Sequence, residues 1–231
     1  MVLFQQPFMS GGFPSMNRAI ILVYDDDFTG SDDWTDANST NITVDTVSDN
    51  FKVNYVRNAS NDKSVYDLQS LLGSPPADKF VIRVHQWNLS VKGASGDIGA
   101  FGLSAGNQTV TWNTAHDEIF FMFGAQGTVD EIGGGVNDGI AMNTALNQVT
   151  QAYSTSTDYY LEIIRDEDDV TINFGTNSDF TSPLKTITDT GANSLVGLRY
   201  LAFTNFDVGT LGTDINSTVQ KIQFYNGVSS V

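Results

Sequence analysis

The sequence predicts an all-β protein, an antiparallel two-sheet β-sandwich of the jelly-roll type with an extended N-terminal arm. Short apolar runs, rich in β-branched and aromatic residues, recur about every 8–12 residues between turn residues, a spacing typical of sandwiches. Asp, Asn, Gly, Ser and Thr are abundant, and these residues favour turns over helix interiors. No stretch carries an apolar face with helical period over three or more turns. We therefore expect about a dozen strands and very little helix.

In the first half of the chain, strands are expected wherever apolar residues alternate or cluster. The stretch SVYDLQSLLGSPP is different, since it predicts one helical turn that ends before Pro75 and Pro76. An aspartate-rich loop at 25–40 carries two aromatics, Phe28 and Trp34, that we expect to be buried. The continuous apolar run of DEIFFMFGAQG predicts a strand covered on both faces. The other strands predicted here are AIILVY (19–24), NITVDTV, FKVNYVRN, KFVIRVHQWNLSV (79–91) and IGAFGLS.

The second half begins with a Gly-rich, weakly patterned stretch from Thr128 to Ser156. It contains EIGGGVNDG and predicts a long excursion rather than a strand. The stretch DYYLEIIRDEDDVTINFG then predicts a hairpin that turns at RDEDD, with Tyr159, Leu161 and Ile163 on one face of its first strand. The runs LRYLAFTNFD and TVQKIQFYNG are expected to complete the domain as strands.

The chain is expected to consist of an N-terminal arm, residues 1–18, and one β-sandwich domain, residues 19–231. The arm differs from a cleavable secretion signal, because no Lys or Arg precedes Arg18 and polar residues, Pro and Gly interrupt its apolar residues. Two interpretations stay open: an arm that docks on another copy or a neighbouring structural protein, and a tail that packs on its own domain. The docking interpretation depends on five apolar residues, Val2, Leu3, Phe4, Phe8 and Phe13.

The charge balance excludes two classes of partner. The chain has 11 basic and 27 acidic residues, a net charge of −16. Nucleic acid and anionic lipid both attract Lys and Arg, so neither nucleic-acid binding nor membrane association is expected. No apolar run approaches the roughly 18 residues of a membrane span. The absence of cysteine excludes a disulfide, a thiolate metal site and a thiol nucleophile. Such an acidic surface repels its own copies unless cations screen it, which suits a salty or marine setting.

Four stretches, taken in order, resemble the concanavalin A-like lectin and glucanase superfamily, which has a laminin G-type jelly roll. They are DDDFTGSDDWTD, FVIRVHQWNLS, YYLEIIRDEDDVTINF and the closing LRYLAFTNFD…GTDINSTVQKIQFYNG, and they span about residues 25–227. The chain is also similar to lectin-like domains of marine archaea and viruses. The resemblance implies two curved antiparallel sheets, with glycan binding or glycan cleavage on a concave face in some members. Because such a fold hosts many functions, the function has to be argued from a site.

No pair of carboxylates has the spacing that glycoside hydrolysis requires. Retaining glycosidases hold two carboxylates about 5–5.5 Å apart. The resemblance to the glucanases implies Glu-x-Asp-x-(x)-Glu on one strand, where alternate residues share a face. Asp117 and Glu118 are adjacent and point to opposite faces, while Glu162 and Asp166 run into a turn. Two histidines are expected to be structural, His85 and His116. We therefore expect a protein without enzymatic activity.

Acidic residues crowd the loop after the first predicted strand, and their hard oxygen atoms suit Ca²⁺. Asp25, Asp26 and Asp27 are the candidate ligands of a structural calcium, the one cofactor that the sequence suggests. The resemblance implies that such a calcium joins the first strand to an acidic residue of the last strand. The matching positions here are Gln220 and Lys221, and a lysine is a poor neighbour for a cation. A calcium site and a turn whose aspartates cap backbone amides both stay open.

Glycan binding needs exposed aromatic rings that stack on sugars and polar side chains that bind hydroxyl groups. The Gly-rich segment 131–139 is the candidate rim of such a site, because binding residues concentrate on loops of rigid scaffolds. Each aromatic candidate could instead belong to the core. The candidate rings and polar ligands are Trp87, Trp112, Tyr153, Asn137 and Asp138.

Three functions are weighed on this basis. The first is a non-enzymatic structural β-sandwich of a virion, as a capsid decoration or tail protein, or of a cell envelope, which assembles through its arm and also attaches to surface glycans. It would be located on the virion or outside the cell. The second is a stand-alone carbohydrate-binding, lectin-like adhesin. The third is a polysaccharide hydrolase or lyase. Deletion of the arm separates the first two, because only assembly depends on it.

Overall fold

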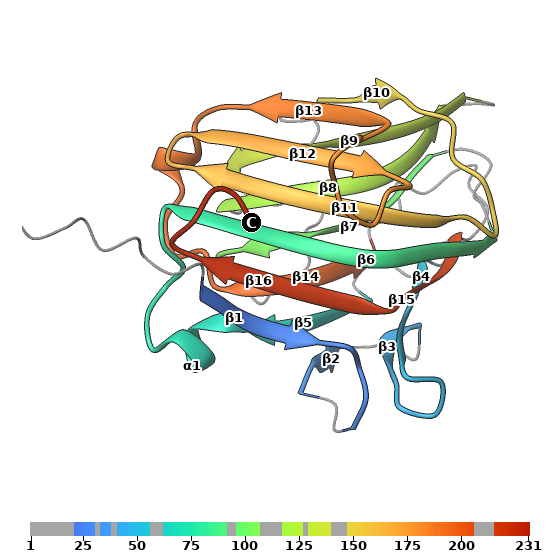
Figure 1. The fold of residues 1–231 in the computed structure, drawn as a ribbon, viewed down its shortest axis with the longest axis horizontal. Helices are drawn as coiled ribbons and strands as arrows, with labels where there is room; N and C mark the ends of the chain where they lie inside the picture. Colours follow the sequence, from blue (N-terminus) through green and yellow to red (C-terminus); the bar gives the residue numbers. More distant parts are fainter. Residues whose placement is uncertain are drawn as a thin grey trace, which may run out of the picture.

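The computed structural model describes residues 21–30, 33–37, 41–55, 62–91, 96–106, 117–126, 129–139, 147–205 and 215–231. These residues form two antiparallel sheets, of nine and seven strands, that stack face to face. In Figure 1 the nine-stranded sheet lies in front and the seven-stranded sheet behind it. Helix is confined, in this part of the chain, to α1 (Leu68–Leu72) and one turn of 3-10 helix, η2 (Ala192–Ser194). The predicted all-β, two-sheet sandwich is confirmed.

The strands of the nine-stranded sheet are β1 (Ile21–Asp26), β3 (Ile42–Asp45), β4 (Asn50–Tyr55), β6 (Lys79–Val91), β11 (Asp158–Asp166), β12 (Asp169–Gly175), β13 (Lys185–Asp189), β15 (Ile215–Val219) and β16 (Lys221–Asn226). Their order is β13-β12-β11-β6-β15-β4-β3, and β16 pairs with both β6 and β1. The central strand is β6, since β11 pairs along one of its edges while β16 and β15 follow each other along the other. The end-to-end arrangement of β16 and β15 creates a junction in the sheet.

The strands of the seven-stranded sheet are β2 (Thr35–Ala37), β5 (Lys63–Asp67), β7 (Gly96–Ser104), β8 (Asp117–Gln126), β9 (Val129–Asp138), β10 (Val149–Thr150) and β14 (Tyr200–Asn205). Their order is β10-β9-β8-β7-β14-β5-β2. The registers of β7, β8 and β9 place Ser104, Glu118 and Asn137 side by side on one face. Residues of β8 on the opposite face, such as Ile119, belong to the core between the sheets.

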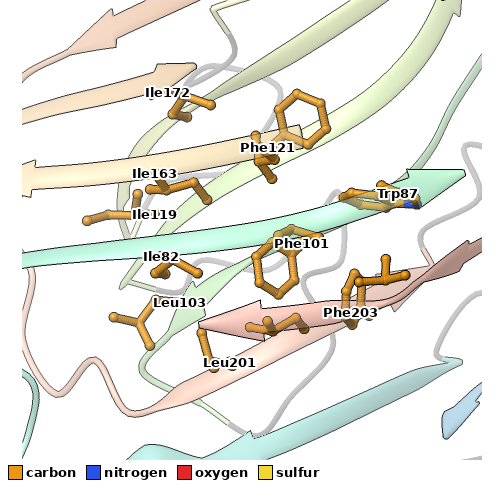
Figure 2. Packing of buried hydrophobic residues seen from close by; sticks show 14 of the residues in the cluster. Ile82, Trp87, Phe101, Leu103, Ile119, Phe121, Ile163, Ile172, Leu201 and Phe203 are labelled. Atoms are coloured by element: carbon orange, nitrogen blue, oxygen red, sulfur yellow. The ribbon is translucent and has the colours of Figure 1, made fainter. Parts of the chain in front are cut away.

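The core fills the space between the two sheets with aliphatic and aromatic side chains. Alternate residues of each strand point into this space, as the period of a β-strand requires. Burial of one such large side chain contributes about 1.5–3 kcal/mol to the free energy of unfolding. Figure 2 shows members from both sheets, among them Ile82, Trp87, Ile163 and Ile172 from the front sheet and Phe101, Leu103, Ile119, Phe121, Leu201 and Phe203 from the back sheet.

Several predicted elements coincide with observed ones. The strand predicted at 79–91 is β6, and the predicted hairpin is β11–β12, whose last paired residues are Asp166 and Asp169. The predicted helical turn is α1. Asp67 caps its start by accepting hydrogen bonds from the backbone N–H groups of Gln69 and Ser70. Gly73 ends it with a φ of 70°, a left-handed conformation that suits glycine. The predicted burial of two loop aromatics is also confirmed, for Phe28 and Trp34.

The predicted excursion between Thr128 and Ser156 is wrong over its first part, because residues 129–138 form β9, which pairs with β8 along its length. The glycines that weaken the strand pattern are required by packing. A Cβ atom on Gly134 would lie 2.5 Å from the backbone oxygen of Phe120 and 2.7 Å from Cδ1 of Ile172. Glycine is therefore required where the neighbouring strand lies closest. Because glycine has no side chain, the alternation that identifies a strand is absent from this part of the sequence.

The predicted arm, residues 1–18, lies outside the described residues, and its two interpretations stay open. In the part of the chain that the structure describes, no helix is long and apolar enough to cross a membrane.

Candidate functional site

Two of the predicted sugar-stacking rings belong to the core, so this prediction is wrong for both. Trp87 is 1% exposed, packs edge-on against Phe123 and donates its indole N–H to the hydroxyl of Ser217 at 2.9 Å. Tyr153 is also 1% exposed, and its hydroxyl donates to the backbone oxygen of Gly124 at 2.8 Å. A ring with no free face cannot stack on a sugar. The third candidate, Trp112, lies outside the described residues.

The predicted polar ligands on segment 131–139 do not form a binding rim either, because this segment is strand β9. Asn137 is fully buried and donates from Nδ2 to Oε1 of Glu118 at 2.9 Å. Asp138, its neighbour on the strand, is exposed and accepts a long hydrogen bond from the hydroxyl of Ser194 at 3.4 Å. The two side chains follow each other on a strand and therefore point to opposite faces.

A hollow of about 450 Å³ opens instead on the outer face of the nine-stranded sheet, the face turned away from the seven-stranded sheet. We call it the outer-face hollow. It lies at the junction where β6 changes partner from β16 to β15. His85 and Gln86 of β6, Tyr160 of β11 and Gln220 between β15 and β16 line it. A sequence pattern could not bring this set together, since Gln86, Tyr160 and Gln220 come from three distant segments of the chain.

A local irregularity of β6 shapes the hollow. Gln86 has a φ of 53°, a conformation that residues other than glycine rarely adopt. Because of it, Val84 and Trp87 both point into the core, and Gln86 is exposed. The backbone N–H of Gln220 donates to the backbone oxygen of His85 at 3.2 Å and holds the junction together. Strained backbone of this kind is often found at binding sites.

The connection between β12 and β13 forms one wall of the hollow and contributes Ser178 to its lining. In Figure 1 this orange connection crosses β11 in front of the sheet. Phe180 anchors it, because its ring packs edge-on against His85 at 5.2 Å and Tyr160 at 5.9 Å between ring centroids. The guanidinium of Arg83 lies 4.5 Å from the centroid of the same ring, a cation–π contact.

Most of the polar side chains of the hollow form no hydrogen bond with the residues that the structure describes. The hydrogen bonds of the described residues include none from the side chains of Asp49, Gln86, Tyr160, Ser178 or Gln220. His85 differs, since its Nε2 lies 2.8 Å from the side-chain oxygen of Gln223. Burial lowers the pKa of His85 below its ordinary value of 6.5. The lining of the hollow thus contains amides, hydroxyl groups, the carboxylates of Asp27 and Asp49, and the ammonium group of Lys221.

Solved structures with the same architecture include a legume lectin and a legume lectin-like domain. Basic winged bean lectin with Tn-antigen matches with a TM-score of 0.63 and 10% identity, over 90% of this chain and 98% of that one. The exoplasmic/lumenal domain of VIP36 in its Ca²⁺/Man-bound form matches with a TM-score of 0.60 and 11% identity, over 90% and 91%. A legume lectin-like domain from Entamoeba histolytica matches with a TM-score of 0.53 and 14% identity, over 84% and 90%.

This chain has a concanavalin A-like fold. The resemblance found in the sequence is therefore confirmed at the level of the fold. No protein-family model matches the sequence, and no curated protein matches it.

The three aspartates predicted to bind calcium do not converge in this concanavalin A-like sandwich. Asp25 pairs with the ammonium group of Lys221 at 2.7 Å. Asp26 accepts hydrogen bonds from the Tyr24 hydroxyl and the backbone N–H of Phe28, and Asp27 accepts from Thr29. The residues that the structure describes include no group of three or more acidic, His or Cys side chains placed to hold a metal. In the described residues these aspartates take part in a capped turn and an ion pair, and a structural calcium stays a prediction.

The concanavalin A-like fold also allows the glycosidase hypothesis to be tested at β8. Ile119, Phe121 and Phe123 face the core, so Glu118, Phe120 and Met122 face the other way. Two apolar side chains thus stand where a second carboxylate on this strand would have to be. Across the neighbouring strands, Glu118 pairs with Ser104 and Asn137.

The other candidate acids and bases take part in structural contacts. Glu162 pairs with Arg83 at 2.9 Å, and Asp166 pairs with Lys79. His116 lies outside the described residues. Both acids, Glu162 and Asp166, are therefore held in ion pairs with basic side chains of β6.

Proposed function

We propose that this chain is a non-catalytic carbohydrate-binding module and that a glycan binds in the outer-face hollow. The observation that carries the proposal is the convergence of five polar side chains that lack partners in the described chain: Asp49, Gln86, Tyr160, Ser178 and Gln220. Polar groups in folded proteins are normally hydrogen-bonded to protein or water. A set that is gathered in one hollow and makes no side-chain hydrogen bonds with the described residues suits the hydroxyl groups of a bound sugar.

Each group has a matching feature on a pyranose ring. The amides of Gln86 and Gln220 both donate and accept, so each can bind two adjacent hydroxyl groups. Tyr160 offers an aromatic surface to the apolar C–H groups of the ring, and its hydroxyl adds a polar tip. The volume of about 450 Å³ falls within the range of small-molecule sites, roughly 300–1,000 Å³.

The fold supports the class of ligand in a general way. The winged bean lectin structure holds Tn-antigen and the VIP36 structure is a Ca²⁺/Man-bound form, so proteins with this architecture bind carbohydrate. At identities of 10% and 11%, these structures show a similar fold and nothing about the position of a site. The position of the site depends on the residues of this chain.

A glycan array followed by calorimetric titration of the best ligand tests the proposal. Gln220→Ala and Tyr160→Ala are each expected to weaken binding about tenfold or more, because each removes a hydrogen-bonding group or a ring from the hollow. The matched control is Gln69→Ala on α1, a glutamine outside the hollow. The proposal fails if no glycan binds, or if the hollow variants bind as tightly as the control.

We propose assembly on a virion or cell envelope as a second role, favoured by the apolar residues of the segment 1–18. The arm would supply the contacts and the hollow the glycan attachment. Location on a particle or outside the cell, and a marine setting, belong to this proposal.

A further inference from the structure

Two carboxylates at the outer-face hollow are available to a ligand. Asp49 is exposed, has a φ of 48° and makes no side-chain hydrogen bond to the described chain. Asp27 is also exposed and accepts hydrogen bonds from the backbone N–H and the hydroxyl of Thr29 through Oδ1. These bonds lower the pKa of Asp27, so it is ionised at neutral pH.

The basic side chains near the hollow are already engaged in contacts within the protein. The Lys221 ammonium pairs with Asp25 at 2.7 Å. Arg83 is held by Glu162 at 2.9 Å and by the ring of Phe180. His85 is largely neutral at pH 7, since burial and the nearby charges of Lys221 and Arg83 lower its pKa. The free charge that faces a ligand is therefore negative.

We infer, on the basis of the proposed glycan-binding function, that the outer-face hollow prefers a glycan that bears a protonated amine, such as an oligosaccharide of glucosamine. The ammonium group would lie between the carboxylates of Asp49 and Asp27, and the ring of Tyr160 adds a cation–π surface. Uronic acid and sulfated glycans are disfavoured, because they would meet these carboxylates within a chain of net charge −16.

The experiment compares three ligands of similar length by titration calorimetry on the full chain. They are a β-1,4-linked glucosamine oligosaccharide, its fully N-acetylated counterpart and a galacturonate oligosaccharide. The titrations are run at about pH 6, where the amine is protonated. The glucosamine ligand is expected to bind about tenfold more tightly than the N-acetylated one, and the preference should shrink in high salt.

Asp49→Asn removes the free carboxylate with little risk to the fold, since asparagine tolerates a positive φ well. The preference for the amine is expected to disappear in this variant and to persist in the control Asp169→Asn, which removes one exposed charge outside the hollow. Equal binding of the amine and its N-acetylated form overturns the inference and leaves the proposed function in place. Tighter binding of galacturonate, or an unchanged preference in Asp49→Asn, also overturns it. If none of the three ligands nor any glycan on the array binds, the proposed function fails as well.

Discussion

Glu118 carries a carboxyl group buried on the face of β8 that points away from the core. It is 1% exposed, and burial raises the pKa of its carboxyl to about 8, although the hydrogen bond from Asn137 acts in the opposite direction. Its second oxygen, Oε2, has no hydrogen-bond partner in the residues described. A carboxyl group kept largely protonated at neutral pH avoids the cost of burying a charge.

The stability of the fold is therefore expected to depend on Glu118 through pH. The folded pKa of about 8 lies above the unfolded value of about 4.3, so the contribution of this group is fully present below pH 4.3. It is lost as pH rises through 8, by at most about 1.4 kcal/mol per pH unit. Glu118→Gln, which stays uncharged and keeps an acceptor for Asn137, should flatten this slope in urea unfolding at pH 6, 7 and 8. The exposed Glu167→Gln serves as control. Equal slopes for wild type and Glu118→Gln would contradict the burial argument.

Lys221 at the start of β16 forms an ion pair with Asp25 of β1 and so links the two strands without a metal ion. We expect EDTA to change neither the melting temperature nor glycan binding, as measured by calorimetry at matched ionic strength. Lys221→Met should cost about 0.2–1 kcal/mol, the value of a partly exposed pair. Lys185→Met, at an exposed lysine of β13, is the matched control. A rise in melting temperature with Ca²⁺ that Mg²⁺ does not produce would refute this expectation.

At the scale of elements, alternating apolar and polar residues were sufficient to predict a strand where one of its faces is buried. The alternation in 79–91 and in the β11–β12 hairpin predicted strands at the right residues, and both are confirmed. Strand β9 was missed because Gly133 to Gly135 have no side chains to alternate. Trp87 was assigned to a surface because a sequence does not reveal which face of a strand is covered. Tyr153 follows β10 in a connecting segment, and the sequence does not reveal that this segment packs its ring into the core.

The candidate site could not be predicted from sequence patterns, for a different physical reason. Asp49, Gln86, Tyr160 and Gln220 come from four separate segments that only the sheet order brings together. Gln86 is exposed beside Trp87 because of its positive φ. The residue type does not indicate this conformation, since glutamine is not favoured at a positive φ. A non-glycine residue in that conformation has to be seen in a structure.

The close packing of β8 against β9 predicts that Gly134 cannot be replaced. Gly134→Ala would place a methyl group 2.5 Å from the backbone oxygen of Phe120, so the strands would have to separate. We expect a loss of about 1–3 kcal/mol in urea unfolding. The control Ser64→Ala, in the same sheet, removes a buried hydroxyl that has no partner in the described residues, and should be neutral or stabilising. Unchanged stability of Gly134→Ala would show that the two strands are less tightly apposed.

At the scale of the whole molecule, a net charge of −16 opposes close packing of copies unless cations or specific contacts compensate. If the arm supplies those contacts, deletion of residues 1–18 should abolish assembly in sedimentation experiments while the sandwich keeps its melting temperature and glycan binding. Replacement of Phe4 and Phe8 by serine is a milder test of the same contacts. Assembly that is unchanged after deletion would remove the second proposed role, and a lower melting temperature would favour the tail that packs on its own domain.

The change of partner along β6 also has a consequence for local opening of the sheet. Because β15 and β16 abut end to end at Gln220, this edge of β6 is covered by two short strands, and each can detach separately. A ligand held by Gln86 and Gln220 would bridge that break. Deuterium uptake by amides of β15 and β16 should then slow on both sides of the junction when sugar is added, including positions that the sugar does not touch.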